Sequence, residues 1–328
     1  QGLGPRPSGR RRGKRVSDKP VAVGVVGVGA LGRHHARVWT AQEGARLVGV
    51  HDTDAARAEA VAAEFGCPVC PDLDSLLAEA QAVSVAVPTV DHHAVARQAL
   101  EKGRDVLLEK PMTATLAEAD DLVDLAERTG ARLQVGHIER FNPATEVLLG
   151  AVKAPRFVEV HRLGSFSPRS LDVDVVLDLM VHDLDIVLAL DGSEPTQIEA
   201  VGVPVLTPRV DIANARLKFA SGLIANVTAS RVSLEKIRKF RVFAPRTYVS
   251  ADFTAREAQI FRLEAPDGSG RPRISSEKRG APEEEPLKRQ IQAFLRSVTS
   301  RSPPVVPGAD GRRALALALA ILARMAEA

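Results

Sequence analysis

The stretch VAVGVVGVGALGRHHARVWT, residues 21–40, decides the fold of this chain. It opens with the apolar, β-branched run Val21–Val26, which predicts a buried strand. Gly27, Gly29 and Gly32 follow in the spacing G-x-G-x-x-G, and a helical pattern then begins. The first glycine permits a tight turn, the second lets a pyrophosphate approach the backbone, and the third lets the helix pack close to the strand. The stretch therefore predicts a dinucleotide-binding βαβ unit.

A carboxylate stands at the end of the next predicted strand, residues 47–51, because Asp52 follows it 20 residues after Gly32. At this position a carboxylate can accept hydrogen bonds from both hydroxyls of an adenosine ribose, and it repels a 2′-phosphate. The sequence therefore favours NAD over NADP, although Arg57 lies nearby and could soften that preference. The competing interpretation is a Rossmann-like fold without a cofactor.

Strand and helix patterns alternate at short spacing in the first part of the chain. The predicted strands lie near residues 21–26, 47–51, 69, 82–87, 105–108 and 132–135. The predicted helices between them lie near residues 31–41, 54–65, 72–79, 91–102 and 116–128. We expect Asp91 to cap the fourth of these helices. Such alternation predicts a parallel, doubly wound sheet.

The pattern changes in the second half of the chain. Residues 157–263 read as short alternating strands, with one helix near 173–190, and residues 265–286 read as a surface loop. Two more helices close the chain, near 287–300 and 312–326. The predicted fold class is α/β, with an N-terminal Rossmann sheet and a C-terminal α+β domain built on a large, open, mostly antiparallel sheet. The expected divisions are a disordered basic tail (1–19), a cofactor domain (20–141) and a substrate and oligomerisation domain (142–328).

Composition narrows the class of protein further. The 328 residues are 45% hydrophobic and 26% charged, as in globular proteins, and no apolar run approaches the ~20 residues of a membrane span. Cys67 and Cys70 are the two cysteines, so a disulfide framework is excluded, and without a second ligand pair nearby we expect no metal site. The basic tail lacks the apolar middle of a secretory signal, and aromatic residues are few. We expect a cytoplasmic protein with neither nucleic acid nor membrane as a partner.

Three later stretches, taken together with the glycine motif, resemble a known family. DVLLEKPMT (105–113) puts Glu109, Lys110 and Pro111 at the carboxyl end of a strand, which is the ligand-binding edge of such a sheet. LQVGHIERFNPA (133–144) and VVLDLMVHDLDIVLAL (175–190) follow. With the glycine motif, these stretches resemble the glucose–fructose oxidoreductase and inositol dehydrogenase (Gfo/Idh/MocA) family of NAD(P)-dependent sugar oxidoreductases. The resemblance covers about residues 20–325.

The resemblance implies a catalytic set. The family's lysine matches Lys110, and its D-x-x-x-H pair matches Asp178 and His182, whose spacing of four puts them on one helix face. Oxidation of a sugar alcohol needs a base for the hydroxyl proton, and imidazole suits that role. Lys110 is expected to stabilise the developing alkoxide, Asp178 to tune His182, and Asp185 to give structural support. The residues expected to bind a polar, anionic substrate beside these three are Arg140, Asn142 and Arg162.

The resemblance also implies that the segment at Pro88 and Thr89 passes the nicotinamide ribose. His92 follows that segment and either contacts the cofactor or only starts a helix. The Lys110–Pro111 bond is expected to be cis, as in family members. The full predicted cofactor set is Gly27, Gly29, Ala30, Leu31, Gly32, Asp52, Pro88, Thr89, His92, Glu109 and Lys110.

Two departures from the commoner family pattern indicate a substrate class. The segment before the D-x-x-x-H helix lacks a glycine triplet, and His137 stands where tyrosine is common. Both resemble the branch that acts on nucleotide-activated amino sugars, such as UDP-N-acetylglucosamine, whose 3-keto product leads to the 2,3-diamino sugar of lipid A. The alternatives are a free polyol or inositol dehydrogenase, an NAD-assisted glycosidase, and a non-catalytic NAD-binding sugar sensor. The resemblance further implies a homodimer or homotetramer that pairs through the second sheet.

Overall fold

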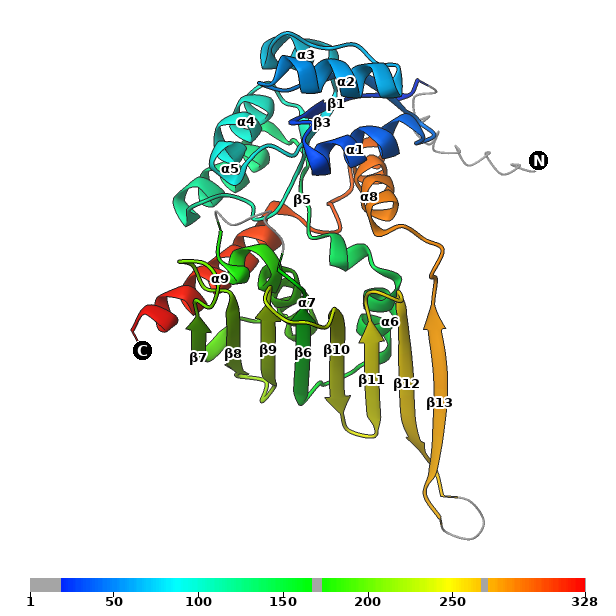
Figure 1. The fold of residues 1–328 in the computed structure, drawn as a ribbon. Coiled ribbons are helices and arrows are strands. Elements are labelled where there is room, and N and C mark those ends of the chain that lie inside the picture. Colours follow the sequence, from blue (N-terminus) through cyan, green and yellow to red (C-terminus); the bar gives the residue numbers. More distant parts are fainter. Residues whose placement is uncertain (1–18, 167–172, 267–270, 328) are drawn as a thin grey trace, which may run out of the picture.

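The structure, a computed structural model, describes residues 19–166, 173–266 and 271–327, so all but the last residue of the predicted basic tail lies outside it. The described chain forms two sheets, one in each half of Figure 1. The first sheet has five parallel strands, in the order β2 (Ala45–His51), β1 (Val21–Val26), β3 (Ala82–Val85), β4 (Asp105–Leu108) and β5 (Leu133–Val135). The helices between these strands are α1 (Ala30–Thr40), α2 (Ala55–Phe65), α3 (Leu73–Glu79), α4 (Thr89–Glu101) and α5 (Leu116–Thr129). The predicted doubly wound sheet is confirmed.

Local sequence signals explain most boundaries in this half. All six residues of β1 are buried, as its continuous apolar run predicts. The side chain of Asp54 caps α2 by accepting a hydrogen bond from the Arg57 N–H, and Gly66 ends that helix in the left-handed conformation. The prediction for α4 was wrong at its start, because the helix begins at Thr89 after Pro88 and Asp91 lies within its first turn. There the Asp91 carboxylate favours the helix through its dipole rather than as a cap.

The second sheet has eight strands and is mostly antiparallel, as predicted. Only the neighbours β6 and β9 run parallel. In sheet order the strands are β13 (Arg273–Gly280), β12 (Glu257–Glu264), β11 (Thr247–Asp252), β10 (Ile237–Ala244), β6 (Phe157–Leu163), β9 (Ile224–Ser230), β8 (Ile212–Phe219) and β7 (Pro195–Val203). The other helices of the described chain are η1 (Ile138–Phe141), α6 (Pro143–Ala151), η2 (Val176–Met180), α7 (Val181–Asp191), α8 (Pro286–Ser300) and α9 (Gly308–Ala326).

Two elements correct the sequence-based prediction. β13 replaces part of the loop expected at residues 265–286, and it pairs along its length with β12 at the edge of the sheet. Most of its side chains are exposed, so it lacks the alternating apolar pattern that marks a half-buried strand. Helix α6 was also missed, although the Asn142 side chain caps it and Pro143 occupies its first turn, both of which are helix-start signals.

The end of the chain returns to the first sheet. Helix α8 lies beside α1 in Figure 1, and its Phe294 ring packs edge-on against Trp39 with the centroids 6.3 Å apart. Both side chains are almost fully buried. Helix α9 contacts both α5 of the first half and α7 of the second. The two halves therefore share elements, and the boundary expected at residues 141 and 142 remains a prediction.

Within the described ranges, no helix combines the length and apolar character that a membrane crossing requires.

Candidate active site

The glycine motif forms an open cradle between β1 and α1. Gly27 has a φ of +77°, a left-handed conformation that favours glycine. A Cβ on Gly29 would have no heavy atom within 4 Å, whereas one on Gly32 would lie 1.8 Å from the Gly27 carbonyl oxygen. A cavity of about 480 Å³ adjoins the cradle, lined among others by Gly27, Gly29, Asp52, Val87 and Pro88. Ala30 and Leu31 are exposed at the start of α1, and no side chain caps that helix. Its first N–H groups are thus open to an anion.

Asp52 lies beside this cradle and is already heavily hydrogen-bonded. Its carboxylate accepts hydrogen bonds from the main-chain N–H of Val28 at 2.7 Å and from that of Asp54 at 2.9 Å. The guanidinium of Arg57 binds both of its oxygens, at 3.1 Å and 2.8 Å. Partial burial alone would raise the pKa of Asp52, but the hydrogen bond from Arg57 and the two N–H groups outweigh it and hold the pKa below its ordinary value.

His92 is buried between two loops at the carboxyl edge of the first sheet. Its Nδ1 lies 2.9 Å from the carbonyl oxygen of Pro111, and its Nε2 lies 3.0 Å from that of Val87. The ring therefore lies between the loop before α4, which carries Val87 and Pro88, and the loop after β4. In the structure His92 therefore contacts the main chain of both loops.

Glu109 is buried and pairs with a residue that the sequence left unassigned. Its Oε1 lies 3.1 Å from Nε2 of His35, which is fully buried on α1. The carboxylate fits there because residue 136 is glycine, where a Cβ would lie 2.6 Å from Oε1. No pattern in the sequence links positions 35 and 109, because their contact depends on how α1 packs against the first sheet.

Lys110 reaches across to the second half of the molecule. Its Nζ donates to the main-chain oxygen of Asp178 at 2.6 Å and to the Asp178 carboxylate at 3.0 Å. The Lys110–Pro111 bond is cis, as predicted. Asp178 lies in η2, a π-helical turn that leads into α7, in place of the first turns of the single helix expected at 173–190. The expected pairing of Asp178 with His182 is thus replaced by a pairing with Lys110.

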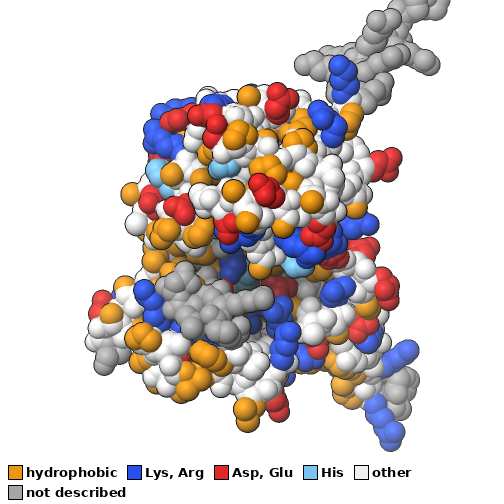
Figure 2. Space-filling model, turned by 45° about the horizontal axis from the view of Figure 1, so that its top comes forward, with side chains coloured by type: hydrophobic (Ala, Val, Ile, Leu, Met, Phe, Trp, Pro, Cys, Tyr) orange, Lys and Arg blue, Asp and Glu red, His pale blue; other side chains and the backbone are white. Residues whose placement is uncertain are grey.

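His182, on the first turn of α7, is 8% exposed and its Nδ1 is buried without a hydrogen-bond partner among the described residues. Burial lowers the pKa of His182 well below its ordinary value, and the nearby cations Lys110 and Arg162 lower it further. The imidazole is therefore neutral near pH 7. The ring of His137, which follows β5, packs edge-to-face against it with centroids 6.0 Å apart. Figure 2 shows Lys, Arg and His side chains gathered along the hollow between the two halves of the molecule.

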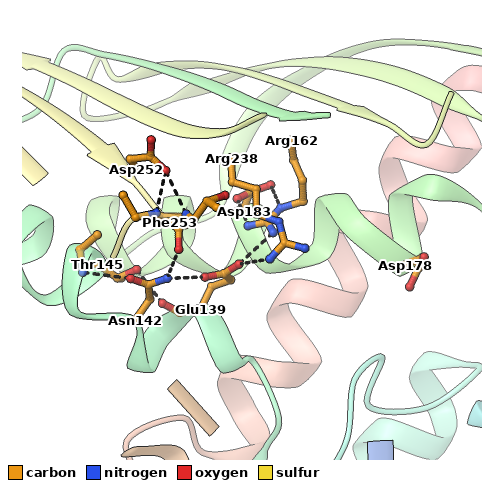
Figure 3. Close-up of polar contacts among 12 residues, drawn as sticks. Glu139, Asn142, Thr145, Arg162, Asp178, Asp183, Arg238, Asp252 and Phe253 are labelled. Atoms are coloured by element: carbon orange, nitrogen blue, oxygen red, sulfur yellow. Dashed lines mark hydrogen bonds and ion pairs between the residues drawn. The ribbon is translucent and has the colours of Figure 1, made fainter. Parts of the chain in front are cut away.

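Two of the residues predicted to bind substrate lie in a buried polar network (Figure 3). Arg162 donates to both oxygens of Asp183, at 2.7 Å and 2.8 Å, and to Glu139 at 2.9 Å. The side-chain amide of Asn142 donates to the carboxylate of Glu139 and to the main-chain oxygen of Phe253, the residue that follows β11. Figure 3 shows this network apart from Asp178.

The third predicted substrate residue, Arg140, also pairs with carboxylates. It contacts Asp310 of α9 at 2.9 Å and Asp185 of α7 at 3.5 Å. These pairs hold η1 against both helices.

Among the described residues, no cluster of His, Cys, Asp and Glu could hold a metal ion.

Comparison with known proteins identifies the family. Residues 21–137 match the model for the NAD-binding Rossmann fold of the Gfo/Idh/MocA oxidoreductase family, and residues 154–248 match the model for the C-terminal domain of that family. UDP-N-acetylglucosamine 3-dehydrogenase from Acidithiobacillus ferrooxidans is 42% identical over 91% of this chain and 95% of its own. The chain belongs to the Gfo/Idh/MocA family. The predicted resemblance is therefore confirmed.

Solved structures of Gfo/Idh/MocA proteins have the same fold. The A. ferrooxidans enzyme superposes with a TM-score of 0.87 at 41% identity, over 92% of this chain and 96% of that one. An inositol 2-dehydrogenase from Rhizobium meliloti is a more distant relative, 27% identical over 94% of this chain and 97% of its own. The cradle, the adjoining cavity and the uncapped start of α1 fit the nicotinamide dinucleotide that this family binds.

Proposed function

We propose that this protein oxidises the 3-hydroxyl of UDP-N-acetylglucosamine to a ketone. The observation that carries the proposal is the 42% identity, over nearly the whole of both chains, to a UDP-N-acetylglucosamine 3-dehydrogenase. The arrangement of Lys110, Asp178 and His182 where the two halves meet supports it, because oxidation of an alcohol needs a base and a stabiliser of negative charge.

In this proposal His182 takes the hydroxyl proton. Its imidazole is neutral near pH 7, which is the form that can accept a proton. Lys110 stabilises the negative charge that develops on the sugar oxygen. An ammonium group has three N–H donors, and Asp178 uses two of them, so one is left to donate to the substrate. When bound, the nicotinamide ring supplies the two-electron acceptor for the hydrogen on the sugar carbon.

Asp178 acts on Lys110 in this proposal and holds its Nζ in place from both the side chain and the main chain. Arg162, Asn142 and Arg140 position η1 and α7, since their polar groups bind carboxylates and main-chain oxygens of those elements and their neighbours. Because η1 follows His137 and α7 carries His182, the networks fix the elements from which both rings project.

NAD is the proposed cofactor. The buried carboxylate of Asp52 suits the two hydroxyls of the adenosine ribose and opposes a 2′-phosphate. Arg57 neutralises part of this charge, and nearly half of its side chain is exposed beside the cavity. We therefore expect a preference for NAD that is measurable but less than absolute.

The test measures NADH formation by absorbance with UDP-N-acetylglucosamine, free N-acetylglucosamine and myo-inositol as separate substrates. We expect turnover with the nucleotide sugar, and a drop in kcat on the order of 10²-fold or more in Lys110→Ala and in His182→Ala. Lys102→Ala and His93→Ala are the control substitutions, because Lys102 pairs with the exposed Asp74 and His93 pairs with the half-buried Asp121. Turnover with myo-inositol alone would contradict the proposed substrate, and normal rates in both site variants would contradict the proposed chemistry.

A further inference from the structure

His137 is a buried residue that the proposed reaction does not yet use. It is 1% exposed, and neither of its ring nitrogens has a hydrogen-bond partner among the described residues. A buried polar group left unpaired destabilises the folded state, so two such atoms on one side chain call for a functional reason.

The backbone around His137 fixes where the ring can lie. The N–H of Ile138 donates to the carbonyl of Gly136 at 2.8 Å, and the N–H of Arg140 donates to the carbonyl of His137 at 3.0 Å. With φ −73° and ψ +76°, His137 is the central residue of an inverse γ-turn at the end of β5. The ring is thus presented from the carboxyl edge of the first sheet by a turn with its own hydrogen bonds.

The ring lies against the proposed base. His137 and His182 pack edge-to-face with their planes at 88°. Nδ1 of His182 is itself buried and has no hydrogen-bond partner among the described residues, so these two neighbouring rings carry three unpaired nitrogen atoms. The other candidate partner of His182, the Asp178 carboxylate, is bound to Lys110 instead.

The chemistry of a histidine base requires one tautomer. For Nε2 of His182 to accept the substrate proton, Nδ1 must carry the ring proton, and a buried N–H needs an acceptor. His137 provides one, because burial lowers its pKa to about 3 and leaves the ring neutral with one free lone pair. A direct hydrogen bond between the rings requires a closer approach than the 6.0 Å that separates their centroids, and at the present distance one bridging water molecule would be needed.

We propose that His137 is a positioning residue that accepts the Nδ1 proton of His182 and thereby fixes the tautomer of the base. This inference rests on the proposed function, since it gives His182 the role of base. The position of His137 in the sequence, after the last strand of the Rossmann sheet, lets one half of the molecule orient a catalytic group of the other.

The first test reads the tautomer directly and needs no substrate. The ¹⁵N signals of the His182 ring, assigned by their loss in His182→Asn, should show a protonated Nδ1 and a bare Nε2 in the wild-type protein. In His137→Phe the two tautomers should mix. A wild-type ring protonated on Nε2 would overturn the proposal, even if the Phe variant fails to fold.

The second test uses turnover with the nucleotide sugar. We expect His137→Phe to lower kcat about 10- to 100-fold, with KM and the Kd for NAD within about threefold of the wild-type values. His137→Gln retains an acceptor and should recover most of the rate, while His93→Phe is the control for loss of an imidazole. The pH profile of kcat should shift in His137→Phe. The other charged and titratable groups around the two rings remain in place in that variant, namely Lys110, Arg162, Arg238, Arg140 and Glu109.

An unchanged kcat and pH profile in His137→Phe, or a main effect on NAD affinity, would overturn the inference. Absence of turnover in the wild-type protein with every nucleotide sugar would instead contradict the proposed function, and the ¹⁵N signals would still report the tautomer.

Discussion

Replacing Gly29 or Gly32 by alanine should have different effects, on cofactor binding in the first case and on stability in the second. A methyl group on Gly29 meets no heavy atom within 4 Å, and the backbone there, with φ −63°, accepts alanine. A methyl group on Gly32 would lie 1.8 Å from the carbonyl oxygen of Gly27, which belongs to the backbone and cannot turn aside. Gly32→Ala therefore strains the fold, whereas Gly29→Ala fills space left for a ligand.

The expected magnitudes follow from this geometry. Overpacking against backbone costs about 3 kcal/mol at Gly32, of which the better helix propensity of alanine recovers about 1 kcal/mol. A net loss of about 2 kcal/mol corresponds to a fall of about 4–8 °C in the unfolding midpoint, if the cooperative unit has about 150–250 residues. At Gly29 the change in capping and the lower entropy of the unfolded chain nearly cancel, so stability should change by less than about 1 kcal/mol.

The assay is thermal unfolding of both variants without and with NAD, together with NAD titration by fluorescence. At a concentration of about 100 times the wild-type Kd, NAD stabilises the wild-type protein by about 2.7 kcal/mol. A Kd about tenfold weaker in Gly29→Ala reduces that gain to about 1.4 kcal/mol. If Gly29→Ala is as unstable as Gly32→Ala without cofactor, or binds NAD as tightly as the wild type, the division of roles between the two glycines is wrong.

Two further predictions concern charge. Asp52→Ala should weaken NAD binding at least tenfold and NADP binding less, because it removes the ribose acceptor and frees Arg57; titration of both cofactors checks this, and equal losses would count against it. Burial raises the pKa of Asp185 to about 7, so the folded state holds a proton that the unfolded state releases above about pH 4. This contribution to stability is complete below about pH 4 and is lost as the pH rises to about 7. The free energy of unfolding of Asp185→Asn should therefore rise relative to that of the wild type between about pH 4 and about pH 7, and a constant difference over that range would refute the prediction.

Much of the fold could be predicted because its signals are local. The continuous apolar run of β1, the glycines that follow it and the Asp54 cap of α2 act within a few residues of the element that they define. The elements that the prediction missed depend on distant partners. β13 has little apolar pattern and exists because β12 offers a line of main-chain hydrogen bonds.

The sequence by itself determined the cradle, the acidic residue after the second strand, and the identity of Lys110, Asp178 and His182 as residues of interest. Only the tertiary structure decided how they pair. Asp178 binds Lys110, which lies 68 positions away, and not the histidine four residues further along the chain. His137 and His182 meet for the same reason, since edge-to-face packing requires two elements to be brought together from separate halves of the molecule. Spacing along a chain fixes which side chains share an element, whereas the contacts of a site depend on where the packing of both sheets sets those elements.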